Sequence, residues 1–116
     1  FLLSEPGLPY AYVEVKNVHL RREADWAEFP DSVTKRGARH LDELSAMAAA
    51  GHRAVMLYVV QRTDCSRMRL AADLDPAYAA AVIRAAEAGV EMLCYGTLID
   101  RAGVRIGTRL PVLAPA

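Results

Sequence analysis

The sequence predicts an α/β domain whose mixed β-sheet is parallel in its centre and antiparallel at its edges. Apolar segments of strand length alternate with two segments of helical periodicity, in the order β-β-α-β-α-β-β. A crossover helix makes the two strands that it joins parallel, whereas short turns at both ends of the chain predict hairpins. A length of 116 residues, of which 53% are hydrophobic, allows one compact domain.

The first two strands are predicted to form a hairpin. Residues 1–4 are a short apolar strand, and residues 5–9 contain the Pro and Gly residues of a turn. The second strand covers residues 10–16 and can extend to Leu20, with side chains that alternate between its two faces. One face carries Val13 and Val15. The other face carries Tyr12, Glu14 and Lys16.

A polar, irregular connection and then a helix are predicted next. The connection covers residues 21–30, and its expected anchors in the core are Trp26 and Phe29. The helix begins with Asp31 or Ser32 as its N-cap and runs to about residue 50. Gly51 suits the C′ position, because glycine adopts positive φ without strain. The spacing predicts one buried stripe: Val33, Gly37, Leu41, Leu44 and Ala48.

The centre of the sheet is predicted at residues 53–60, whose nearly unbroken apolar run is typical of a strand covered on both faces. Residues 61–74 are rich in Arg and Asp and are predicted as a loop. The second helix begins with Asp75 as N-cap and Pro76 at N1, and it ends at Gly89. Its shared face is Tyr78, Val82, Ala85 and Gly89.

The last two strands are predicted as a second hairpin. Residues 91–99 and residues 104–110 alternate as strands, and residues 100–103 form the turn between them. Pro111 and Pro115 are expected to end regular structure.

Composition limits the functions that are open to the chain. Fourteen Lys and Arg balance fourteen Asp and Glu, which excludes a global attraction to nucleic acid but not a local basic patch. The longest apolar run, at residues 54–60, is far shorter than a membrane span. Cys65 and Cys94 lack metal or disulfide spacing, so we expect reduced thiols and a cytoplasmic protein. Because the chain begins with Phe1, we expect it to be the downstream part of a longer protein.

The first candidate for chemistry is Glu14-Val15-Lys16. Residues two apart on a strand aim their side chains to the same side, so this carboxylate and this amine share a face. The carboxylate and the main-chain carbonyl of Val15 are oxygen ligands of the kind that hard divalent cations prefer. The amine can orient a water and offset phosphate charge, as in metal-assisted phosphodiester hydrolysis. The alternative is a solvated strand face with a cross-strand ion pair.

The second candidate is the basic start of the first helix: Lys35, Arg36, Arg39 and His40. Together with the positive end of the helix dipole, these side chains can hold a phosphate backbone. The alternative is a solvated face on which Asp42 and Glu43 pair with the basic residues.

The third candidate is Gln61-Arg62, at the carboxyl end of the predicted central strand. Side chains there reach the crevice in which open α/β sheets bind ligands. Gln61 can orient a water or a metal ligand, and Arg62 can hold a phosphate. The alternative is an ordinary polar strand end.

Several segments in order along the chain resemble the sugar fermentation stimulation protein A family. They are residues 12–18 (YVEVKNV), 29–37 (FPDSVTKRG), 40–41 (HL), 51–55 (GHRAV), 59–62 (VVQR), 75–76 (DP) with Tyr78, and 87–91 (EAGVE). The resemblance implies a restriction-endonuclease-like domain of the PD-(D/E)xK superfamily. In that family this domain follows an N-terminal OB-like domain, which would be absent from the present chain.

The resemblance also implies a function and assigns residues to it. The family is regarded as a DNA or RNA nuclease and as a DNA-binding factor that affects sugar metabolism. Glu14 and Lys16 match the acid and the lysine of the ExK motif, and Gln61 matches a polar position after the next core strand. The family's first catalytic Asp is expected immediately before Phe1. Asp31 cannot replace it, because Asp31 follows ExK in the sequence.

The leading hypothesis is therefore a nuclease domain that uses Mg²⁺ or Mn²⁺. Glu14, Val15 and the upstream Asp would hold the metal, and Lys16 would act on the attacking water, with Gln61 as a further catalytic residue. The phosphate backbone of DNA or RNA would be held by Lys35, Arg36, Arg39 and Arg62. The alternatives are a non-enzymatic DNA-binding regulator of sugar (maltose) metabolism genes, helped by the upstream domain, and a structural domain with oligomer contacts such as a homodimer.

Overall fold

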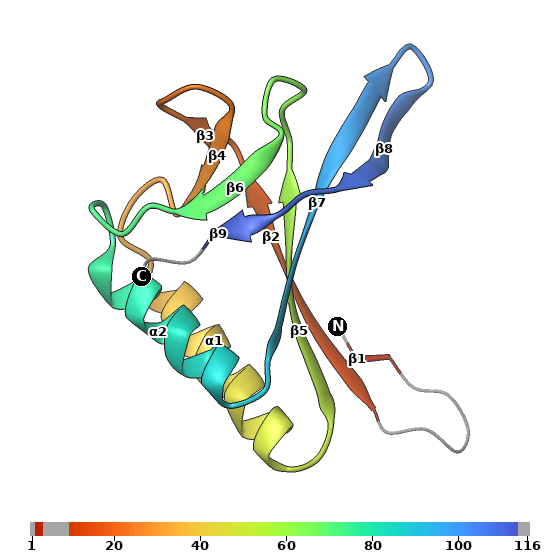
Figure 1. Ribbon diagram of the computed structural model, residues 1–116. Coiled ribbons are helices and arrows are strands. Elements are labelled where there is room, and N and C mark those ends of the chain that lie inside the picture. Colours follow the sequence, from red (N-terminus) through yellow and green to blue (C-terminus); the bar gives the residue numbers. More distant parts are fainter. Residues whose placement is uncertain (1, 4–9, 114–116) are drawn as a thin grey trace.

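The computed structural model describes residues 2–3 and 10–113, and its main sheet has five strands in the order β1-β2-β5-β7-β8. The strands are β1 Leu2–Leu3, β2 Ala11–Val18, β5 Arg53–Val60, β7 Glu91–Asp100 and β8 Gly103–Arg109. β2, β5 and β7 are parallel, whereas β1 and β8 run antiparallel at the two edges (Figure 1). This arrangement confirms the predicted mixed sheet and both hairpins. The turn predicted at residues 5–9 and the stop at Pro115 lie outside the described residues.

A second, smaller sheet corrects the sequence prediction. Its strands lie in the order β3 Leu20–Arg21, β4 Trp26–Phe29, β6 Arg67–Leu70 and β9 Val112–Leu113. Residues 21–30 and 61–74 are therefore not wholly irregular, and Pro111 does not end regular structure. These strands have two to four residues, so each depends on partners that are remote in sequence.

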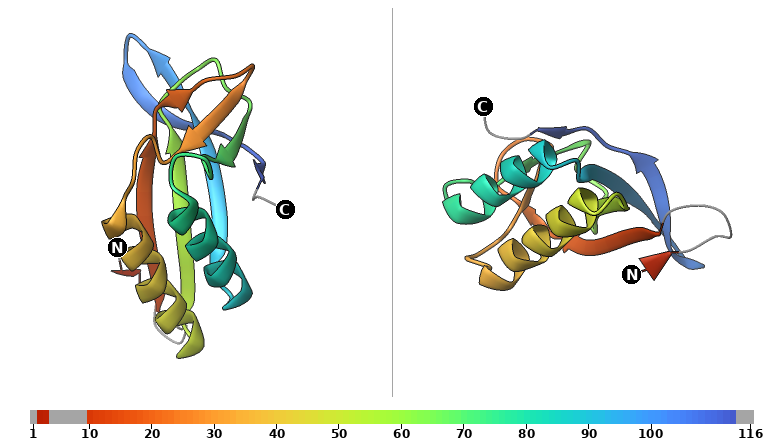
Figure 2. Two further views of the ribbon diagram at one scale, coloured as in Figure 1. Left: turned by 90° about the vertical axis from the view of Figure 1, so that its left-hand side faces the viewer. Right: turned by 90° about the horizontal axis from the view of Figure 1, so that it is seen from below.

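Both helices cover one face of the five-stranded sheet, side by side. They are α1 Lys35–Ala49 and α2 Pro76–Glu87 (Figures 1 and 2). The N-cap of α1 is Thr34, whose side chain accepts from the Gly37 amide at 3.0 Å, so the prediction of Asp31 or Ser32 is wrong. Val33 lies before the helix and is 67% exposed instead of buried. A serine or threonine hydroxyl satisfies a free amide of the first turn wherever the chain bends into the helix.

The start of α2 agrees with the sequence. Asp75 is its N-cap and accepts from the Tyr78 amide at 3.0 Å, with Pro76 at N1. Asp75 also accepts from the Thr34 amide at 2.8 Å, which ties the beginnings of the two helices together. Gly37 allows this close approach, since a Cβ there would lie 3.0 Å from the Tyr78 ring. Both predicted C′ glycines have positive φ: Gly51 (92°) and Gly89 (103°).

The core lies between the helices and the sheet. Its fully buried large side chains include Leu41, Met56, Tyr58, Tyr78 and Cys94. The hydroxyls of Tyr58 and Tyr78 are hydrogen-bonded at 2.7 Å, so these buried polar atoms satisfy each other. Burial raises the pKa of both tyrosines, and it raises the pKa of the Cys94 thiol to about 11. These groups therefore belong to the packed interior. Among the described helices, none is long and apolar enough to cross a membrane.

Candidate functional site

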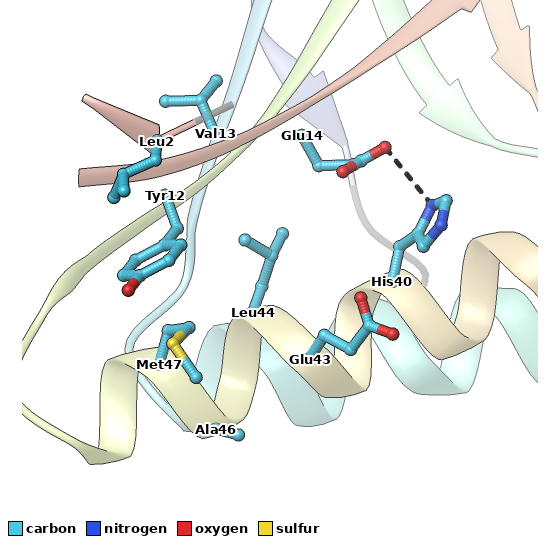
Figure 3. Close-up of a pocket in the computed structure, with 9 residues that line it drawn as sticks. All are labelled: Leu2, Tyr12, Val13, Glu14, His40, Glu43, Leu44, Ala46 and Met47. Carbon is cyan, nitrogen blue, oxygen red and sulfur yellow. Dashed lines mark ion pairs between the residues drawn. The ribbon is translucent and has the colours of Figure 1, made fainter. Parts of the chain in front are cut away.

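Glu14, Lys16 and His40 meet where β2 faces α1. The Lys16 Nζ lies 3.7 Å from the Glu14 Oε1 and 2.9 Å from the His40 Nδ1. The His40 Nδ1 lies 3.3 Å from the same Glu14 oxygen, and Figure 3 shows this carboxylate pointing toward the imidazole. The acid and the amine predicted from Glu14-Val15-Lys16 therefore converge on one spot with a third group.

The register of the sheet explains this placement. Glu14 and Lys16 pair with Met56 and Tyr58 of β5, whose side chains lie in the core. The same face of β2 must therefore point toward the helices, and the two polar side chains emerge at the flank of α1. Their exposed fractions are 33% for Glu14, 17% for Lys16 and 16% for His40, so the group is partly shielded but open to solvent.

His40 is the residue whose position the sequence did not reveal. The sequence indicated only a cation in the basic start of a helix. The structure places its ring against a lysine that is 24 residues earlier in the chain. The Lys16 ammonium donates to Nδ1 in the neutral tautomer that carries its proton on Nε2, because Nδ1 then has a free lone pair. No spacing rule could have found this contact, since it depends on how the crossover helix packs on the sheet.

A groove of about 490 Å³ runs from this polar group along the seam between β2 and α1. The lining residues are Leu2, Tyr12, Val13, Glu14, His40, Glu43, Leu44, Ala46 and Met47. Figure 3 shows Tyr12 reaching down from β2 toward Leu44 and Met47 on α1. One end of the groove is thus polar and the other is aromatic and aliphatic.

The three other basic residues of the α1 start lie exposed on the helix. The side chains of Lys35, Arg36 and Arg39 form no hydrogen bond or ion pair within residues 2–3 and 10–113. The pairing with Asp42 and Glu43 that the sequence left open is therefore not formed there. Arg36 precedes His40 by four residues and so lies one helical turn from it. His40 belongs, with Glu14 and Lys16, to the polar group that we call the Glu14 group.

The structure does not bring Gln61 or Arg62 to the Glu14 group. Gln61 donates to the Asn17 Oδ1 at 3.2 Å. Asn17 follows Lys16 directly on β2, so its side chain and its bond to Gln61 lie on the opposite face of the sheet. Arg62 donates from two nitrogens to Asp64 at 2.8 and 2.7 Å, and this pairing raises the pKa of Arg62 and lowers the pKa of Asp64. The role predicted for Arg62 would require release of Asp64.

As a metal site, the described part of the chain supplies only a portion of a ligand shell. Within it, no group of three or more His, Cys, Asp or Glu side chains is arranged to hold an ion. The Glu14 carboxylate nevertheless fits a hard cation, because it is 33% exposed and is not enclosed by a bidentate partner. The ligand role of the Val15 carbonyl stays a prediction.

A second charged cluster, which the sequence did not indicate, lies in the small sheet. Both oxygens of Glu28 accept from Arg22, at 2.8 and 2.9 Å, and one also accepts from Arg69 at 3.2 Å. Arg22 also donates to both oxygens of Asp73, at 2.7 and 2.8 Å. These bonds hold the pKa of Glu28 below its usual range and lower the pKa of Asp73 to about 2. Glu28 is only 3% exposed and its carboxylate is bonded within this group, which we call the closed cluster.

Comparisons with known proteins agree with this architecture. The family described as "Sugar fermentation stimulation protein RE domain" matches residues 1–103. Among curated relatives, the sugar fermentation stimulation protein homolog of Dinoroseobacter shibae is 72% identical, over 97% of this chain and 46% of the relative. The homolog of Jannaschia sp. is 68% identical over the same shares. The chain thus spans less than half of the length of these relatives.

A solved structure shares the fold. It is described as Pyrococcus furiosus SfsA in complex with Ca²⁺, and it superposes with a TM-score of 0.82 at 31% sequence identity. The match covers 90% of this chain and 45% of that one. The predicted restriction-endonuclease-like fold is therefore confirmed, and this chain belongs to the sugar fermentation stimulation protein (SfsA) family, whose RE domain it matches.

Proposed function

We propose that this domain is a nuclease that hydrolyses phosphodiester bonds of DNA or RNA with Mg²⁺ or Mn²⁺. The observation that carries the proposal is the convergence of Glu14 and Lys16, whose charged atoms lie 3.7 Å apart at the mouth of a groove. A solvated strand face would not bring a side chain of α1 to the same spot, whereas the His40 Nδ1 lies within 3.3 Å of both charged groups. An acid and an amine on one spot can serve a metal and a phosphate together.

Each group of the site has a distinct part in this mechanism. Glu14 would hold the cation, which, when bound, supplies Lewis acidity toward the phosphate and lowers the pKa of a water ligand. Lys16 would orient the attacking water and stabilise the negative charge that develops on the phosphate oxygens. The contact of 2.9 Å between the His40 Nδ1 and the Lys16 Nζ limits the positions that the amine can take.

The register of the edge strand supports a second carboxylate beside Glu14. Leu2 pairs with Tyr12, and Leu3 pairs with Ala11. Toward its N-terminal end, β1 thus advances along β2 in the direction of Glu14. Opposed residues of neighbouring strands share a face. The Asp that the family resemblance implies upstream of this edge strand would add oxygen ligands for the cation.

Substrate contacts would come mainly from α1. Lys35, Arg36 and Arg39 have charged ends that are not taken up by partners within the described residues, so they are available to phosphates. Arg62 would join them only after it releases Asp64. The catalytic role of Gln61 remains a prediction, and its bond to Asn17 would make that role indirect.

The test is cleavage by the full-length protein with labelled DNA and RNA in Mg²⁺ or Mn²⁺. We expect Glu14→Gln and Lys16→Met each to lower the rate by about 100-fold or more. The matched controls are Glu91→Gln and Arg53→Met, which remove an exposed ion pair of 2.6 Å elsewhere on the same sheet. If cleavage by the two site variants equals that by the controls, the nuclease assignment is wrong.

The cations of α1, which have no partner among the described residues, also favour a second candidate, a DNA-binding regulator of sugar metabolism without turnover. Because the chain has no net charge, such binding would draw on the upstream OB-like domain that the resemblance implies, or on a homodimer. It predicts salt-dependent DNA binding, weakened by Arg36→Ala, with no cleavage at any divalent metal. Metal-dependent cleavage that Lys16→Met abolishes would reject this candidate.

A further inference from the structure

We propose that the groove between β2 and α1 binds the nucleoside next to the phosphate held at Glu14 and Lys16, so that the substrate strand is unpaired at this point. The inference rests on the proposed function and adds a substrate class to it. The polar end of the groove is the Glu14 group, and its other end is built from Tyr12, Leu44 and Met47. A nucleotide needs polar surroundings for its phosphate and apolar surroundings for its base, and the two ends of the groove offer these in turn.

Size and chemistry agree with a nucleoside as the occupant. The volume of about 490 Å³ lies within the range of sites that hold small organic ligands. Bases bind to proteins through their faces, on aromatic and aliphatic side chains, and Tyr12 and Met47 offer such surfaces. Glu43 lies at the rim, where its carboxylate can accept from an amino group of a base.

Charge complementarity favours a nucleic acid over an apolar peptide in this groove. Lys16 stands at the polar end, and Lys35, Arg36 and Arg39 precede the groove on the same helix without partners among the described residues. A nucleic-acid strand that runs along α1 would thus place its phosphates on these basic residues of the first helical turns and one base in the apolar part of the groove. An apolar peptide would leave these cations without counter-charges.

The geometry restricts the form of the substrate. In a duplex, both faces of a base are stacked on its neighbours, and its edge is paired with the other strand. A base that occupies a groove between a strand and a helix must leave that stack, which costs a few kcal/mol in an intact duplex and little in a single strand. The site therefore selects single-stranded segments or frayed ends.

The test fills the groove without removing a core side chain. Ala46 lines the groove and is exposed, so Ala46→Phe adds bulk there, whereas Ala80→Phe adds the same bulk to an exposed position of α2 outside the groove. The full-length protein is titrated in Ca²⁺ with a labelled single-stranded 12-mer, with an abasic 12-mer and with a duplex, and strand integrity is checked on a gel.

We expect Ala46→Phe to weaken binding of the single strand by about tenfold, the range of one lost stacking contact, and to leave abasic binding within about twofold. Ala80→Phe should change neither, and wild type should bind the single strand more tightly than the duplex. An equal loss for both 12-mers, or no loss, overturns the proposal. A lowered melting temperature with equal losses would identify the occupant as another part of the protein and also overturns it.

The outcome is separable from that of the proposed function. If no metal supports cleavage but binding still depends on the base, the nucleoside site stands and the nuclease assignment falls. If cleavage depends on Glu14 and Lys16 but Ala46→Phe has no effect on binding, the nuclease stands and the nucleoside site falls.

Discussion

Two charged clusters among the described residues differ in how far their polar atoms are bonded within the cluster. In the small sheet, both oxygens of Glu28 are bonded to Arg22 within 2.9 Å, and the carboxylate is 3% exposed. Beside α1, the nearest charged atoms of Glu14 and Lys16 are 3.7 Å apart, and Glu14 is 33% exposed. The carboxylate of the first cluster is fully hydrogen-bonded within the cluster, whereas the carboxylate of the second cluster can still bind a further partner.

This difference separates a structural role from a binding role. A buried carboxylate is tolerated only when its oxygens are fully bonded, so Glu28 and its guanidinium partners are tied to folding. A carboxylate that is one-third exposed and has no bidentate partner keeps lone pairs for a cation, which is what a ligand site needs. A cavity of about 430 Å³ also adjoins the Arg22 network, but the guanidinium of Arg22 that lines it is already bonded to Glu28 and Asp73.

The largest effect on folding is expected from breaking the closed cluster. Glu28→Ala would leave Arg22 and Arg69 without their buried acceptor, and we expect a loss of about 3–5 kcal/mol in the free energy of opening. Glu14→Ala is the matched change at the Glu14 group, and it should lower the same free energy by about 1 kcal/mol or less. Amide hydrogen exchange across β4 and β6 measures both in the full-length protein. Equal costs for the two variants would erase the distinction.

The second-largest effect on folding is expected from low pH, which should weaken the closed cluster. The folded-state pKa values of Glu28 and Asp73 are lowered by their bonds to Arg22, with Asp73 at about 2. Such groups stabilise the fold above their ordinary pKa values, and the stabilisation is lost as the pH falls through the folded values. We therefore expect a progressive loss between about pH 4.5 and pH 2.

The measurement is thermal unfolding of wild type and of Asp73→Asn across this pH range. The variant should show a shallower decline, because it no longer carries one of the lowered carboxylates. The difference should shrink at high salt, since Asp73 is 64% exposed and its ion pair is screened. A variant that declines as steeply as wild type at low salt would contradict the assignment.

The contrast between the clusters also shows what the sequence could predict. The five-stranded sheet follows from patterns within single segments: alternation in the outer strands, an apolar run at residues 53–60 and helical periodicity between the strands. The shared face of Glu14 and Lys16 follows from alternation alone. Glu28 and Arg69 are 41 residues apart, and their strands are too short for a pattern to be convincing, so the small sheet was not predicted. The place of His40 beside Lys16 depends on packing between a helix and a strand and has no local signal either.

A smaller effect should follow from adding metal. Mg²⁺ or Mn²⁺ at ten times its dissociation constant would stabilise the full-length protein by about 1.4 kcal/mol, because only the folded site binds it. A thermal-shift titration should show this rise in wild type and in Asp73→Asn but not in Glu14→Gln. A rise that persists in Glu14→Gln would place the metal elsewhere.

The smallest effect on folding is expected from changes of His40, which should mainly alter the position of the Lys16 amine. Its removal costs one partly shielded hydrogen bond, about 1 kcal/mol or less, but it frees the Lys16 amine to move. We expect His40→Ala to lower kcat for cleavage by about tenfold with little change in KM, which is the signature of a positioning residue. In His40→Asn the side-chain oxygen can take the place of Nδ1 and should restore most of kcat. His40→Gln carries its oxygen one bond further and should not, so equal rates for Asn and Gln would show that the contact with Lys16 does not set the position of the amine.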